Sequence, residues 1–182
     1  MAASADDPTV ELAKRVAAEA AVVGIPTALI GAMALAAHGY VRATDDADLG
    51  ACTTFSPALC ALRDRLRALG LDVELRSLDD DDPLDGVLVV EDGDALVEVV
   101  NIGNVRLGRA AIDHAMDLGD GLRCVRASEL VALKLYAGGR KSRLDVHELL
   151  DANPAIDREE VARTCAGLGL ADDWAKIVAE RS

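Results

Sequence analysis

The chain has 182 residues and a mass of 19.0 kDa, which suits one medium-sized domain with at most a small appended part. Hydrophobic residues make up 51% of it, enough to bury a core, and this excludes a disordered chain. Aromatic residues make up only 2%, which argues against a surface that stacks single-stranded nucleic acid. Because no long uncharged apolar run is present, we expect no membrane span, no secretory signal and a cytoplasmic location.

Charge is unevenly distributed along the chain. There are 19 basic and 32 acidic residues, a net charge of −13, which disfavours general binding to nucleic acid. Residues 101–150 are the only net positive segment, and an RNA that bound the protein would be expected to dock there. The basic side chains expected at such a contact are Arg106, Arg109, Arg123, Arg126, Arg140, Lys141 and Arg143. The acidic run at 79–82 is expected to be a solvated loop.

The cysteines do not form a recognisable metal or disulfide pattern. There is no CxxC pair and no histidine at the spacing of a zinc site. We therefore expect small packing residues in a reducing compartment at Cys52, Cys60, Cys124 and Cys165.

Helical and strand-like periods alternate through the first half of the chain. Alanine and valine at helical spacing, with Thr9 as a cap and Gly24 at the end, predict an amphipathic helix. The elements expected next are a strand over 26–30, a helix over 32–38, a strand over 46–52 and a helix over 56–69.

The period changes to two after residue 70, and helices dominate the last third. Alternation predicts three strands, with a hairpin turn at 91–94 between the last two. These strands are expected over 71–76, 87–90 and 95–102, followed by a helix over 109–116, a strand over 122–125, a helix over 128–137 and interrupted helices from 142 onward. The pattern predicts an α/β (α+β) fold in which helices flank a mixed central sheet. A core over 1–126 would carry a packed helical C-terminal portion over 127–182.

Polar residues at three points of this pattern suggest chemistry. Gly31 lies where a strand turns into a helix, a place where free backbone N–H groups and a missing side chain let an anion approach. Asp46 and Asp48 lie two apart on a predicted strand, so both carboxylates share one face. Glu98 is a charge inside an apolar strand, which is costly without a partner. A divalent cation held by all three carboxylates would provide that partner, with phosphates completing its coordination.

Each of these features also has an ordinary structural explanation. Two aspartates at this spacing are often plain surface acids, Gly31 alone is often just a turn, and Glu98 would be harmless on the solvated face of an edge strand. The order and spacing of the features favour the functional interpretation. A glycine turn and a short helix precede the paired carboxylates, and the third acid follows on a later strand.

Residues 31–49 resemble the signature of the polymerase-beta-like nucleotidyltransferase superfamily. More narrowly, they resemble the AbiEii-type, minimal nucleotidyltransferase branch that is associated with bacterial toxin–antitoxin systems. The matching positions are Gly31, Ala32, His38, Gly39, Arg42, Thr44, Asp46, Asp48 and Leu49. A second block over 128–150 resembles the helical portion of that branch, with Lys134 and then Asp145 at the corresponding positions.

The resemblance implies the nucleotidyltransferase fold and a transfer reaction that uses an NTP and two Mg²⁺ ions. Asp46 and Asp48 would hold both ions, and Glu98 would bind one of them and help to activate the acceptor hydroxyl. The triphosphate would be held at Gly31 and Ala32, with its charge neutralised by Arg42 or Lys134 and with Thr44 beside it. Two positions depart from the pattern of the family. Ala32 replaces a glycine or serine, so only its backbone N–H can contact phosphate, and Glu98 replaces the commoner aspartate.

Several of these side chains have a second role open to them. His38 suits a structural role at a helix end, and Thr44 suits the orientation of the strand that carries the aspartates. Arg42 would bind phosphate or pair with a nearby aspartate, and Lys134 would bind phosphate or extend from an apolar helix into water. Asp145 would be a helix-surface acid or part of the site.

Three functions remain open from the sequence. The resemblance favours transfer to tRNA or a protein in a toxin–antitoxin setting, with a cognate antitoxin as a further partner. The first alternative is transfer to a small cationic molecule, as in aminoglycoside-modifying enzymes, which the acidic surface would suit. The second alternative is a degenerate domain that binds a nucleotide or partner without catalysis.

Overall fold

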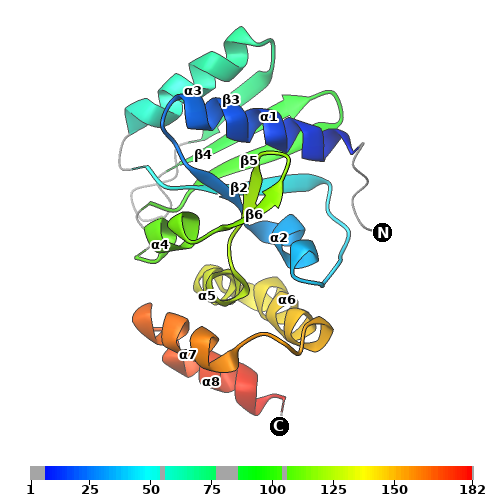
Figure 1. Cartoon of the computed structure of the whole chain (residues 1–182), viewed down its shortest axis with the longest axis vertical. Coiled ribbons are helices and arrows are strands. Elements are labelled where there is room, and N and C mark those ends of the chain that lie inside the picture. Colours follow the sequence, from blue (N-terminus) through cyan, green and yellow to red (C-terminus); the bar gives the residue numbers. More distant parts are fainter. Residues whose placement is uncertain (1–6, 54–55, 77–85, 104–105, 182) are drawn as a thin grey trace.

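A computed structural model describes residues 7–53, 56–76, 86–103 and 106–181 of the chain (Figure 1). The acidic run at 79–82 lies outside these residues. Strands are β1 (Thr27–Leu29), β2 (Asp46–Ala51), β3 (Asp72–Arg76), β4 (Val87–Asp92), β5 (Ala95–Asn101), β6 (Met116–Gly119) and β7 (Leu122–Cys124). Helices are α1 (Pro8–Val22), α2 (Gly31–Ala37), α3 (Ser56–Ala68), α4 (Gly108–Asp113), α5 (Ala127–Ala137), α6 (Gly139–Ala152), α7 (Arg158–Gly167) and α8 (Ala171–Ala179). None of these helices has the length and apolar character needed to cross a bilayer.

The described strands form one mixed sheet in the order β3-β4-β5-β2-β1-β7-β6. β2 lies antiparallel to β1 and parallel to β5, so the strand with the paired aspartates is central in the sheet. β4 and β5 form the expected hairpin, in which Gly93 takes the positive φ of 62° that a tight turn requires. The expected fold class is therefore confirmed in its mixed sheet and flanking helices.

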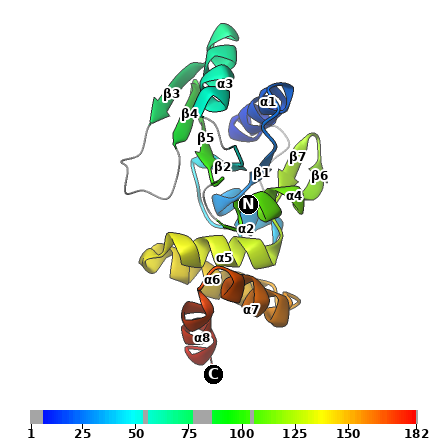
Figure 2. The same ribbon diagram turned by 90° about the vertical axis from the view of Figure 1, so that its left-hand side faces the viewer.

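Helices α1 and α3 cover one face of the sheet, as the side view shows (Figure 2). Their apolar stripes, which include Leu12 and Leu62, are fully buried against that face. β5 shows the consequence as a strict alternation, with Ala95, Val97 and Val99 buried and the residues between them partly exposed. No described helix covers the other face of β3, β4 and β5 in this view.

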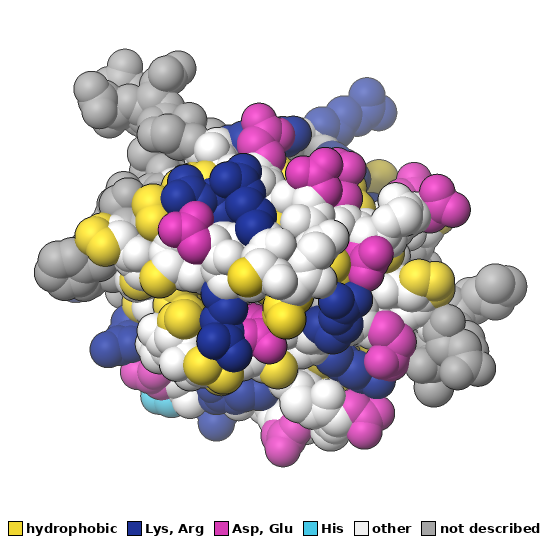
Figure 3. All heavy atoms as spheres, turned by 90° about the horizontal axis from the view of Figure 1, so that it is seen from above, with side chains coloured by type: hydrophobic (Ala, Val, Ile, Leu, Met, Phe, Trp, Pro, Cys, Tyr) yellow, Lys and Arg dark blue, Asp and Glu magenta, His cyan; other side chains and the backbone are white. Residues whose placement is uncertain are grey.

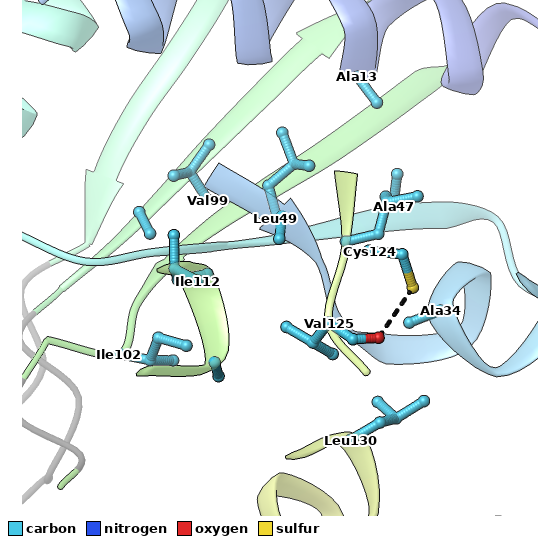
Figure 4. Packing of buried hydrophobic residues seen from close by; sticks show 14 of the residues in the cluster. Ala13, Ala34, Ala47, Leu49, Val99, Ile102, Ile112, Cys124, Val125 and Leu130 are labelled. Carbon is cyan, nitrogen blue, oxygen red and sulfur yellow. Dashed lines mark hydrogen bonds between the residues drawn. The ribbon is translucent and has the colours of Figure 1, made fainter. Parts of the chain in front are cut away.

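The helices α5 to α8 lie together at the opposite end of the molecule from α3 (Figure 1). Leu130 of α5 packs toward Val125 beneath the sheet, and Ile112 of α4 lies near Leu49 and Val99 (Figure 4). This helical group coincides with the predicted C-terminal portion over 127–182. The division of the chain into two parts at residue 126 stays a prediction.

Cys124 and Cys165 are buried packing residues, as expected, and Cys52 and Cys60 are partly buried. All four are free thiols. The Cys124 thiol donates to the Val125 carbonyl oxygen over 3.3 Å (Figure 4). Burial raises the pKa of Cys124 to about 12, because the charged thiolate is poorly solvated there.

Three expected element ends were wrong. The first helix is capped by Asp7, whose side chain accepts the Thr9 amide hydrogen, because Pro8 lacks an N–H and fits the first helical position. The helix expected over 109–116 ends at Asp113, and the residues that follow form the exposed edge strand β6. The helix expected from 142 begins three residues earlier, at Gly139.

Candidate active site

Three carboxylates lie on one face of two neighbouring parallel strands. Asp46 and Asp48 are two residues apart on β2, and the register places Asp48 directly opposite Glu98 of β5. Residues that are directly opposed on adjacent strands point to the same side of a sheet, with Cβ atoms about 5 Å apart. The topology therefore brings together the three acids that the sequence suggested.

The electrostatics of Asp48 reflect this crowding. Burial raises the pKa of Asp48, and the negative charges of Asp46 and Glu98 raise it further. The positive charges of Lys134 and Arg42 act on the pKa of Asp48 in the opposite direction. A cation between the carboxylates would relieve their mutual repulsion.

The donor set suits a hard divalent cation, because carboxylate oxygens are the ligands that Mg²⁺ prefers. Among the described residues, however, no three His, Cys, Asp or Glu side chains already have the arrangement of a metal site. The three carboxylates thus lie on one face of the sheet, but their side chains are not yet positioned to bind one metal ion together. A bound ion would have to draw their side chains together.

Gly31 begins α2 directly against Asp48. A Cβ at Gly31 would lie 1.7 Å from the Asp48 Oδ2 atom, so no side chain fits there, and the φ of +51° also favours glycine. The preceding Ile30 amide donates to the Asp48 carbonyl oxygen over 2.9 Å. The structure gives its own reason for the glycine, the close approach of the Asp48 carboxylate, and the expected contact with a phosphate stays a prediction.

Thr44 and His38 both make structural contacts of the kind that the sequence allowed. The Thr44 hydroxyl donates to the Asp46 Oδ1 atom and so fixes that side chain at the start of β2. His38 is buried at the end of α2, and its ring Nε2 donates to the Val125 carbonyl oxygen over 2.7 Å. The histidine therefore links the end of α2 to the residue that follows β7.

Asp145 is buried, although the sequence left open that it lies on the surface of a helix. Its side chain is only 3% exposed, so the helix-surface interpretation was wrong. Its Oδ2 atom lies 2.8 Å from Lys134 Nζ, and its Oδ1 atom lies 3.2 Å from Arg42 Nε. We call these three residues the Asp145 ion cluster. The cluster joins α5 and α6 to the loop before β2.

Arg42 pairs with the distant Asp145, which is not one of the neighbouring aspartates that the sequence suggested as its partner. Phosphate binding by Arg42 stays a prediction. A signal for Asp145 was present in the sequence. Asp145 lies on the apolar stripe of α6 that also carries Val146 and Leu149, and both of those are fully buried. An acid in such a stripe needs a basic partner.

Two hollows flank α2. One of about 210 Å³ is lined by Gly31, Asp48 and Lys134, together with apolar residues of α5, and we call it the Lys134 cavity. The other, of about 150 Å³, is lined by residues that include Ala32, Arg42 and Thr44. The five residues expected to bind phosphate are thus divided, with Gly31 and Lys134 on one hollow and the other three on the second.

Comparison with known proteins shows the fold. No protein-family model matches the chain, and no curated protein matches it. The solution structure of the antibiotic-resistance factor ANT(2'')-Ia matches with 18% identity over 94% of this chain and 96% of that chain, at a TM-score of 0.57. An antigenic nucleotidyltransferase-like protein from Paracoccidioides brasiliensis matches with 15% identity over 96% and 93%, at a TM-score of 0.53. A crystal structure of ANT(2'')-Ia in complex with adenylyl-2''-tobramycin matches with 18% identity over 95% and 98%, at a TM-score of 0.51.

These similarities confirm the expected nucleotidyltransferase fold over nearly the whole chain. The narrower likeness to the AbiEii-type branch stays a prediction. The roles of the individual site residues also stay predictions.

Proposed function

We propose that the protein is a nucleotidyltransferase that moves a nucleotidyl group from an NTP to an acceptor hydroxyl with the help of Mg²⁺. The observation that supports this most is the set of three carboxylates on one face of β2 and β5. One of these carboxylates, Asp48, also lines the cavity that Gly31 and Lys134 line. Such an arrangement offers cation ligands and a phosphate-sized hollow in one place.

In this proposal Asp46, Asp48 and Glu98 would hold the metal, with two ions expected from the family resemblance. Bound Mg²⁺ supplies positive charge that stabilises the attacking and leaving oxygens. Lys134 neutralises phosphate charge in its cavity, where Asp145 fixes its ammonium group. Thr44 keeps the Asp46 carboxylate oriented, so that less reorganisation is needed when substrate binds.

The bond changes follow from this placement. The acceptor oxygen forms a bond to the α-phosphorus, and the bond from that phosphorus to the bridging oxygen breaks, so that pyrophosphate leaves. Glu98 accepts the proton of the acceptor hydroxyl at a carboxylate oxygen. Gly31 has no side chain that would clash with the Asp48 carboxylate beside it.

A macromolecular acceptor, tRNA or a protein in a toxin–antitoxin setting, is what the family resemblance suggests. Several arginines expected at an RNA contact already have partners within the protein. Arg123 donates to the carbonyl oxygens of Asp113 and Ala115, and Arg126 donates to that of His114. The engagement of these arginines favours the second candidate, a small cationic acceptor, and the neighbour solved with adenylyl-2''-tobramycin supports it. Figure 3 shows the α3 end of the molecule, where basic and acidic side chains are interspersed.

The test is transfer from NTPs labelled on the α-phosphorus, with Mg²⁺ and with total RNA or tobramycin as acceptor. We expect labelled product from the native chain and a loss of about a hundredfold or more in Asp46→Asn and Asp48→Asn. Asp45→Asn is the matched control, because it removes the same charge from an exposed neighbour outside the strand. Absence of NTP turnover in the native chain would instead support the degenerate domain.

A further inference from the structure

A second surface hollow lies at the helical end of the molecule, where α6 meets the end of α8 (Figure 1). Its volume is about 450 Å³, and we call it the Leu144 hollow. The residues that line it are Arg140, Arg143, Leu144 and His147 of α6 and Glu180, which follows α8. Because the α6 residues recur at intervals of three and four positions, they form one stripe along that helix.

The stripe lies on the outer side of α6. Asp145, Val146 and Leu149 are buried on the other side of the same helix, whereas Leu144 is 54% exposed. Removing the surface of this leucine from water would favour the binding of an apolar group beside it. A molecule bound here lies across α6 from the Asp145 ion cluster and is therefore not the acceptor of the proposed transfer.

The charge of this surface is opposite to that of the chain as a whole. The first turn of α6 has no acidic residue and contains Arg140 and Lys141, on a chain whose net charge is −13. Both side chains are exposed, and neither forms an ion pair with any residue that the structure describes. Two cations without partners favour the approach of a negatively charged group.

The Leu144 hollow already holds one carboxylate, which the chain itself supplies. Arg143 Nη2 lies 2.7 Å from Glu180 Oε1, and His147 Nε2 lies 2.8 Å from Glu180 Oε2. The hydrogen bond from His147 and the positive charge of Arg143 lower the pKa of Glu180, so both favour its charged form. The stripe thus binds carboxylate oxygens at one end, and its other two cations are available for a further carboxylate.

We propose that the Leu144 hollow is the docking site of an acidic protein segment. An apolar side chain of that segment packs against Leu144, and its carboxylates pair with Arg140 and Lys141. Nucleic acid suits this surface less well, because a phosphate backbone has no apolar group to place against Leu144. The exposed Glu148 and Asp151, further along the same helix, would also repel phosphates. Docking of the segment is independent of the proposed transfer reaction.

The test is binding of a fluorescein-labelled peptide made of alternating Glu-Glu and Leu-Leu pairs, measured by fluorescence anisotropy with the full chain. A salt concentration of about 0.15 M screens repulsion from the distant acids of the chain. In Arg140→Glu/Lys141→Glu we expect the Kd to rise about tenfold, because attraction becomes repulsion. In Leu144→Ser we also expect a rise of about tenfold, because the apolar contact is lost.

Matched controls make the same changes at exposed positions outside the hollow. They are Arg109→Glu/Arg163→Glu on α4 and α7, and Leu69→Ser after α3. In both controls the Kd should change by no more than about twofold. Circular dichroism verifies that all variants fold, and two-dimensional NMR of the native chain with the peptide provides a readout that needs no variant.

Binding of the Glu-Leu peptide with both expected losses, and with NMR shifts centred on residues 140–147, supports the inference. Absence of binding, shifts centred elsewhere, or equal Kd values in the hollow variants and their controls overturn it. Equal binding of the corresponding Lys-Leu peptide also overturns it, since the acids would then not be recognised. Binding of polyuridylate without binding of the Glu-Leu peptide overturns it as well, because the partner would then be a nucleic acid.

Discussion

Replacing Asp145 with asparagine tests the most deeply buried charge of the site. The substitution keeps the shape of the side chain and leaves Lys134 and Arg42, which are 15% and 20% exposed, without their shared counter-charge. Removing one partner of a buried ion pair costs about 3–5 kcal/mol, and the partial exposure of both cations favours the lower value of about 3 kcal/mol. For a chain of 182 residues this corresponds to a fall of about 6–12 °C in the midpoint of thermal unfolding.

The matched control is Asp151→Asn on the same helix. Asp151 also pairs with an arginine, Arg181, but its side chain is 66% exposed, so the unfolding midpoint should stay near that of the native chain. The double variant Asp145→Asn/Lys134→Met should be less destabilised than the two single variants predict together, because it also removes an unpaired cation. Equal midpoints for Asp145→Asn and Asp151→Asn, or strict additivity in the double variant, would refute the account of the Asp145 ion cluster.

Three further outcomes are expected. Gly31→Ala should lower both the unfolding midpoint and the transfer rate, because its Cβ would lie 1.7 Å from the Asp48 carboxylate; a variant with native midpoint and rate would contradict this contact. Thr44→Val should slow transfer about tenfold with little change in fold, through the lost hydrogen bond to Asp46, and Thr44→Ser should restore the rate. Because burial raises the pKa of Cys124 to about 12, the reactive thiolate forms only far above neutral pH. Iodoacetamide at pH 8 should therefore leave this thiol unmodified in the folded chain and label it after denaturation, as read by mass spectrometry.

Local patterns were enough to predict most of the fold and the carboxylates. Apolar periodicity located the strands that become β2 and β5, and spacing by two placed Asp46 and Asp48 on one face. Whether Glu98 would join them depended on strand order, which periodicity does not contain. The parallel pairing of β2 with β5 provides that information.

The strand β6, the Arg42–Asp145 pair and the Asp7 cap were not predicted, because short stretches of sequence do not determine them. β6 is exposed along its whole length, so it carries no buried face and no apolar alternation to reveal it. The pairing of Arg42 with Asp145 joins segments about a hundred positions apart, so no short window contains both residues. The cap at Asp7 was missed because Thr9, a good capping residue itself, lies two positions later.

The distance along the chain between Arg42 and Asp145 bears on the order in which the protein is made. A growing polypeptide that has just completed the sheet already carries the acids of β2 and β5, yet Lys134 and Asp145 have still to be translated. Until α5 and α6 have been synthesised and packed against the sheet, Arg42 lacks its partner Asp145. The α5 residues that line the Lys134 cavity are also missing until then. In the proposed function, phosphate binding by Lys134 would therefore become possible only late in biosynthesis. A truncated product that stops after β7 would keep the acids but lack both later residues.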